Sequence, residues 1–138
     1  MKELEADLYF DGGSRGNPGP SGVGIVLINT STQKTIAETS IFIGHTTNNA
    51  CEYAGLIHGL QLAQQHGISR INIYSDSMLV VNHINGSYKV RNSRLKPIYD
   101  RAIDLLKLFG DGYTVNHIPR AKNARADELS NEAMNRGY

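Results

Sequence analysis

The sequence lacks several features that would mark a secreted or membrane-bound protein. Among its 138 residues there is one cysteine, Cys51, and no tryptophan. A single cysteine excludes an internal disulfide and indicates a reducing compartment, so we expect a cytoplasmic protein. No apolar run is long enough to span a bilayer, and the first residues contain no signal-peptide core. The sequence therefore predicts no membrane association.

A strong excess of charge is also lacking. The formal net charge is +1, whereas a dedicated nucleic-acid binder is often far more basic. Local basic clusters do occur in two segments, one with Lys89, Arg91, Arg94 and Lys96 and the other with Arg120, Lys122 and Arg125. On charge alone, a solvated surface is the simplest interpretation of both clusters.

No low-complexity linker or internal repeat divides the chain, so its length predicts a single domain over residues 1–138. Apolar and polar residues alternate up to Asp11, which predicts a half-buried strand that ends there. A Gly- and Pro-rich turn is expected over 12–22, followed by strands at about 23–28 and 35–43. Short connections between these three strands favour an antiparallel meander.

The second half of the chain alternates helices with strands. A helix capped by Thr47, Asn48 or Asn49 is expected to end at Gly67, with Glu52 in its first turn. We then expect a strand at 71–75, a short helix at 77–85, a helix from about 94, a strand at 113–117 and a helix from about 123. This order predicts an α/β fold with a five-stranded mixed sheet, a meander plus parallel strands, flanked by helices.

Acidic residues lie near predicted element ends in four separate segments, at Asp11, Glu52, Asp76 and Asp127. Carboxylates that meet at one point repel one another and need cations. Carboxylates and water are preferred ligands of Mg²⁺ and Mn²⁺, and Mg²⁺ held by acidic side chains usually acts on phosphate groups. The four residues therefore predict a metal-dependent nuclease. Singly, each also fits turn chemistry or a helix start.

Four segments, in order and over nearly the whole chain, resemble the type 1 ribonuclease H family (RNase HI): DGGSRGNPGPSGVGIV, TTNNACEYAGL, YSDSMLVV and NARADELSNEA. The resemblance implies an RNase H-like fold in a monomer. It also implies a metal-dependent endonuclease that hydrolyses the RNA strand of RNA/DNA hybrids by a two-metal-ion mechanism, leaving 5′-phosphate and 3′-hydroxyl ends. Two Mg²⁺ ions, or Mn²⁺ as a substitute, would then be held by Asp11, Glu52, Asp76 and Asp127.

The resemblance further implies contacts with the substrate. The Gly-rich segment that includes Gly12 and Asn17 would contact the RNA strand, and it lacks the GK[ST] ending of a phosphate-binding loop. Asn48 and Asn49 would read the minor groove, where 2′-hydroxyls distinguish RNA from DNA. Thr47 would help to hold a phosphate of the DNA strand. Thr47, Asn48 and Asn49 also suit a helix cap.

Two features depart from the family pattern. The basic, Trp-bearing insertion of many members is missing. We therefore expect either a weaker affinity for the hybrid, or a partial replacement of the insertion's phosphate contacts by Lys89, Arg91 and Arg94. The second departure concerns a histidine that bacterial members carry on a loop before the last aspartate and that is thought to aid product release. His117 aligns with it without gaps but falls at a strand end. Arg120 lies on the loop and resembles the arginine of relatives that lack the insertion, and we favour it.

Three alternatives remain open at this point. A catalytically weak hybrid-binding module would share the fold, although all four acidic residues are present. A related nuclease would also cleave double-stranded RNA or DNA, because fold does not settle substrate. A small-molecule α/β enzyme would need a cofactor signature, which the sequence does not contain.

Overall fold

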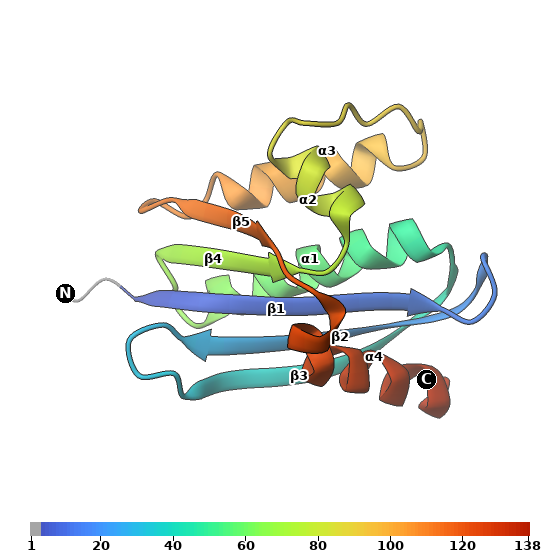
Figure 1. Ribbon diagram of the computed structural model, residues 1–138, viewed down its shortest axis with the longest axis horizontal. Coiled ribbons are helices and arrows are strands. Elements are labelled where there is room, and N and C mark those ends of the chain that lie inside the picture. Colours follow the sequence, from blue (N-terminus) through green and yellow to red (C-terminus); the bar gives the residue numbers. More distant parts are fainter. Residues whose placement is uncertain (1–3) are drawn as a thin grey trace.

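Residues 4–138 are described by a computed structural model, drawn in Figure 1. Their helices and strands follow in the order β1 (Glu5–Ser14), β2 (Gly19–Asn29), β3 (Thr35–Thr46), α1 (Asn48–Gln65), β4 (Arg70–Ser75), α2 (Met78–Ile84), α3 (Lys96–Leu106), β5 (Tyr113–His117), the 3₁₀ helix η1 (Arg120–Asn123) and α4 (Ala124–Arg136). None of the helices in this part of the chain has the length and apolar character required to cross a membrane.

The strands form one mixed sheet in the order β3-β2-β1-β4-β5. β1, β2 and β3 pair antiparallel, as their short connections require, and β4 and β5 add to β1 in parallel. The chain between β1 and β4 passes through α1, and the chain between β4 and β5 passes through α2 and α3. The predicted mixed α/β sheet with a meander is confirmed.

Helices cover both faces of the sheet, as the separate positions of α1 and α4 in Figure 1 suggest. Alternate residues of β2 show the two faces. Ile25 belongs to the main core together with residues of α1 such as Leu60, whereas Val26 packs against Ala126 and Leu129 of α4. The side chains of β1 divide in the same way, with Phe10 in the main core and Tyr9 on the α4 side.

Two glycines let helices lie directly on strand backbone. A Cβ atom at Gly12 of β1 would be 2.4 Å from the Cys51 carbonyl oxygen of α1. A Cβ at Gly24 of β2 would be 2.0 Å from the Ala126 carbonyl oxygen of α4. Any side chain at either position would push the helix away, because the obstructing atoms are backbone. The two close approaches bring both helices onto the same end of β1.

Two local predictions were wrong. The first strand does not end at Asp11 but runs on to Ser14, because Gly12 and Gly13 pair with β2 instead of forming a turn. Asp11 still lies at an open edge, since the pairing of β1 with β4 stops at Tyr9 and Tyr74. Glu52 is not in the first turn of its helix but one turn later, because α1 already begins at Asn48.

Candidate active site

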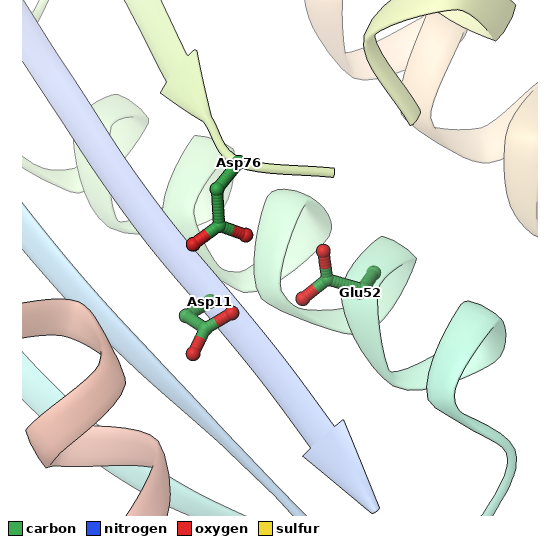
Figure 2. Close-up of side chains that lie close together, drawn as sticks. All are labelled: Asp11, Glu52 and Asp76. Carbon is green, nitrogen blue, oxygen red and sulfur yellow. The ribbon is translucent and has the colours of Figure 1, made fainter. Parts of the chain in front are cut away.

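Three carboxylates from three elements meet at one end of the sheet. Asp11 is on β1, Glu52 is on α1, and Asp76 follows the last residue of β4; Figure 2 shows the three side chains pointing toward one another. Each offers a carboxylate oxygen, and these oxygens all lie within 4.8 Å of one another. The meeting of distant acidic residues predicted from the sequence is therefore confirmed for these three.

The parallel pairing of β1 with β4 sets Asp11 beside Asp76. Tyr9 and Tyr74 pair across these strands and their rings stack, with centroids 4.9 Å apart and planes 15° apart. Asp11 and Asp76 each lie two residues further on, so they share the face of the tyrosine stack. After Asp76 the chain turns away, because Ser77 caps α2 by accepting a hydrogen bond from the Val80 N–H.

Glu52 reaches this group from the opposite face of the sheet. Its Oε1 accepts a hydrogen bond of 2.5 Å from the backbone N–H of Gly12, which fixes its carboxylate against β1. The Glu52 side chain is buried. Burial, and after it the charge of Asp11, raises the pKa of Glu52 well above its usual range. The backbone N–H of Gly12 thus positions an acidic side chain, and Gly12 also lines the cleft described below.

Asp11 is the electrostatic centre of the group. Burial raises the pKa of Asp11 to about 7, with further contributions from the charge of Asp76 and from Asp127. Ser130 Oγ lies 3.3 Å from Asp11 Oδ2 but also donates to the Asp127 carbonyl at 2.8 Å. Uncompensated carboxylates of this kind repel one another until a cation or a proton is added. The donor set, carboxylate oxygens only, fits Mg²⁺ or Mn²⁺.

Asp127 stands beside the three-carboxylate group without being part of it. It lies in the first turn of α4 and lines the same cleft. The Arg120 guanidinium is 3.7 Å from the Asp127 carboxylate, and the Arg120 side chain is 81% exposed. Arg120 and His117 both line the cleft, so the structure brings both candidates for the product-release role to its edge.

The carboxylates open into a cleft of about 610 Å³. Its lining is mainly polar and comes from the β1–β2 hairpin, the starts of α1 and α2, the segment after β5, and α4. One wall, on α4, consists of Asp127, Ser130, Asn131 and Met134, which recur at helical spacing. An open, acidic and largely polar cleft suits a charged polymer better than a small apolar ligand.

The amide side chains predicted to bind substrate are joined to the hairpin. Asn48 Oδ1 accepts a hydrogen bond from the Ser14 N–H at 2.8 Å, and the Asn48 N–H donates to Asn17 Oδ1 at 3.1 Å. Thr47 caps α1, because its Oγ1 accepts from the Ala50 N–H at 3.2 Å. The predicted helix cap is confirmed and is assigned to Thr47.

A second groove lies next to these residues. It has a volume of about 570 Å³, and its lining includes Asn17, Thr47, Asn49, Asn92 and Arg94. The groove therefore joins the predicted substrate residues to the basic segment before α3. Asn48 lines the acidic cleft instead. The start of α1 therefore contributes residues to both the acidic cleft and the second groove.

Sequence reasoning missed several residues of the site. Ser130, Asn131 and Met134 follow Asp127 at helical spacing, and this signal was available once Asp127 was named. Asn123 was noted only as the start of a helix, yet its side chain contacts Asp76. No local pattern distinguishes such an asparagine from a simple cap.

Comparison with known proteins gives a consistent result. The family model described as Reverse transcriptase-like matches residues 9–133. Ribonuclease HI of Halobacterium salinarum is 43% identical over 126 residues, which are 91% of this chain. The chain spans 62% of the length of that relative.

Solved structures agree with the computed one. The crystal structure of RNase H1 from Halobacterium salinarum matches with a TM-score of 0.92 and 41% identity, over 96% of this chain and 98% of that one. LC11-RNase H1 in complex with an RNA/DNA hybrid matches with a TM-score of 0.89 and 39% identity, over 95% and 97% of the two chains. By its sequence, its fold and its cluster of carboxylates, the chain belongs to the ribonuclease H family.

Proposed function

We propose that this chain is an endonuclease that uses divalent metal ions to hydrolyse the RNA strand of RNA/DNA hybrids, leaving 5′-phosphate and 3′-hydroxyl ends. One observation carries the proposal: Asp11, Glu52 and Asp76 bring carboxylate oxygens within 4.8 Å of one another in an open cleft. A folded protein keeps such mutual repulsion when it serves a function, because the repulsion by itself opposes folding. The family relation and a hybrid-bound relative support the choice of substrate.

Asp11, Glu52, Asp76 and Asp127 are the residues that we propose hold two cations. Mg²⁺ is proposed as the native ion and Mn²⁺ as a substitute, since both prefer oxygen ligands. Two cations held there would supply activation of the attacking water and neutralisation of the leaving oxygen in an in-line displacement at phosphorus. The protein contributes the fixed directions of its carboxylates, for example through the bond between Gly12 N–H and Glu52.

We propose that the hybrid lies across both hollows at once. The scissile RNA phosphate would sit at the acidic cleft, and the hairpin with Asn17 and Asn48 would contact the minor groove beside it. Short amides and backbone groups suit hydrogen bonding to 2′-hydroxyls. The DNA strand would reach the second groove, where Thr47, Asn49 and Arg94 lie. Lys89 and Arg91 would extend this contact along the same segment.

Arg120 is proposed to assist release of the product. Its guanidinium is largely exposed, close to Asp127, and at the edge of the cleft. An exposed cation at this place can attract the phosphate of the cleaved strand as that phosphate leaves the carboxylates. His117 lines the same edge and remains the second choice.

The test is a cleavage assay with a labelled RNA strand paired to DNA, in Mg²⁺, in Mn²⁺ and in a chelator. We expect metal-dependent cutting of the RNA strand with 5′-phosphate ends. RNA/RNA, DNA/DNA and single-stranded RNA serve as comparison substrates, and preferential cutting of RNA/RNA would contradict the substrate assignment. Tight hybrid binding without cleavage in either metal would instead identify a binding module. A single domain over residues 1–138, the monomeric state and the cytoplasmic location stay predictions.

A further inference from the structure

Asn123 stands at the junction of η1 and α4 and is almost completely buried, with 1% of its surface exposed. An asparagine at the start of a helix normally accepts a hydrogen bond from a backbone N–H of the first turn. The Asn123 side chain makes no such bond to α4. Its amide therefore serves a purpose other than capping.

The amide of Asn123 instead donates in two directions. Nδ2 lies 2.9 Å from the Phe10 carbonyl oxygen and 3.3 Å from Asp76 Oδ2. A side-chain amide has two N–H groups, one for each of these acceptors. The reversed orientation would set Oδ1 against a carbonyl and a carboxylate. The two acceptors therefore fix which way the amide faces.

Both acceptors lie just beyond the point where the sheet opens. The pairing of β1 with β4 ends at Tyr9 and Tyr74, so Phe10 and Asp76 lie past the last paired residues. Among residues 4–138, Asp76 receives a side-chain hydrogen bond from Asn123 alone. Asn123 thus bridges the gap between the two strands at the position where the carboxylates converge.

The other polar atom of the Asn123 side chain is its amide oxygen, Oδ1. Oδ1 is buried without a hydrogen-bond partner among residues 4–138, and a buried acceptor without a partner lowers stability. Buried polar atoms are rarely left in this state, and each case needs an explanation. An apolar residue of similar shape would avoid the cost. The Asn123 amide therefore supplies two donated bonds, to Phe10 and Asp76, that an apolar residue could not make.

We infer that Asn123 is a positioning residue for the acidic cleft: its amide holds the Asp76 carboxylate toward Asp11 and Glu52 and ties the start of α4, which carries Asp127, to β1. The inference rests on the proposed metal-dependent function of the same cleft. A neutral donor suits this place, because a lysine or arginine would compete with the cations for Asp76. Groups that orient metal ligands in this way influence metal affinity although they touch no metal.

The test compares Asn123→Leu with a matched control, Asn116→Leu. Leucine has nearly the shape of asparagine and no donors. Asn116 donates from its side chain to the Ile73 carbonyl at 3.2 Å and to Thr114 Oγ1 at 3.0 Å, but to no carboxylate. The measurements are Mn²⁺ affinity of the metal-free protein by calorimetry, thermal unfolding, and the Mg²⁺ concentration for half-maximal cleavage. KM for the hybrid is measured at saturating metal.

We expect Asn123→Leu to weaken Mn²⁺ binding about 10-fold and to raise the required Mg²⁺ similarly, with KM unchanged. Asn116→Leu should leave metal affinity unchanged. Wild-type Mn²⁺ affinity in folded Asn123→Leu would overturn the inference, and so would an equal loss in both variants. If Asn123→Leu fails to fold, Asn123→Ser is measured in the same way, because a serine hydroxyl is too short to reach Asp76.

The same experiments separate this inference from the proposed function. Metal-dependent cleavage by the wild type, lost in Asp11→Asn, supports the function whatever Asn123→Leu does. Normal metal affinity in Asn123→Leu then removes only the positioning role. A wild type that neither binds Mn²⁺ nor cleaves the hybrid would instead remove the function itself.

Discussion

Two aspartates on the same face of β1 have opposite surroundings. Asp7 is 7% exposed and accepts hydrogen bonds from Thr30 at 2.8 Å, Asn72 at 3.2 Å and Gln33 at 3.3 Å. Asp11, beyond the Tyr9–Tyr74 stack, faces Glu52, Asp76 and Asp127, with the hydroxyl of Ser130 at 3.3 Å. Donors satisfy the first carboxylate, whereas the second has mainly other carboxylates around it.

The difference shows how one strand serves both stability and chemistry. A buried carboxylate that accepts several hydrogen bonds is a structural group, because its charge is already compensated. A carboxylate packed among others lacks this compensation, and a bound cation can supply it. Exposure alone does not distinguish a structural carboxylate from a metal-site carboxylate, since Asp7 and the metal-site candidate Glu52 are both buried.

The largest expected effect comes from Asp11→Asn. The change removes a proposed metal ligand without altering the shape of the side chain. We expect cleavage of the hybrid in Mg²⁺ to fall by more than about 100-fold, beyond the usual effect of losing a partner that only supports a ligand. Steady-state cleavage assays measure this, with circular dichroism to show an unchanged fold. Near-normal cleavage by the folded variant would contradict the metal assignment.

Asp7→Asn should give the reverse pattern. One carboxylate oxygen becomes an NH₂ group that faces other donors, so hydrogen bonds from Thr30, Asn72 or Gln33 are lost. We expect the free energy of unfolding to fall by about 2 kcal/mol, with cleavage per folded molecule unchanged. Urea denaturation followed by activity assays measures both quantities. A loss of catalysis at full stability would show that the two aspartates are not distinct in role.

The metal-free protein should lose stability as pH rises. The pKa of Asp11 is raised in the folded state from 3.8 to about 7, so its proton is held more tightly when folded. The resulting stabilisation is complete below about pH 4 and is lost as pH rises to about 7. In chelator at pH 8, Asp11→Asn should melt above the wild type, by about 4 °C for each kcal/mol of repulsion removed.

The control for this prediction is the same pair of proteins at acid pH and with metal. Near pH 4 the difference in melting temperature should shrink, because Asp11 is then protonated in the folded state and no longer repels its neighbours. Added Mg²⁺ should raise the melting temperature of the wild type more than that of Asp11→Asn. Differential scanning calorimetry gives all of these values, and a variant less stable than the wild type at pH 8 in chelator would contradict the predicted repulsion.

The smallest expected effect belongs to Arg120→Ala. Because the side chain is exposed and its pairing with Asp127 is loose, stability should not change. Multiple-turnover kcat should fall about threefold, on the order of 0.7 kcal/mol, whereas the single-turnover rate should stay constant. His117→Ala provides the comparison. A larger turnover defect in His117→Ala would transfer the release role to that residue.

The local pattern of the sequence was sufficient for much of the framework. Alternation up to Asp11 placed that residue on the face opposite Phe10, and hydroxyl residues before apolar runs marked helix starts such as Thr47. These features depend on hydrogen bonds and side-chain periods within a few residues. The predicted element boundaries were wrong where pairing with a segment distant in sequence sets the boundary. The pairing of Gly12 and Gly13 with β2 extended the first strand beyond its expected end.

The sequence by itself determined which acidic residues are present, the order of the elements and the faces on which side chains lie, because these follow from local periodicity. Only the tertiary structure decided how the carboxylates converge and which donors they receive. Glu52 is fixed by the N–H of Gly12, and Asn123 bonds to Phe10 across 113 positions of the chain. The raised pKa of Asp11 likewise arises from burial and from neighbours that are distant in sequence, and no local pattern encodes either.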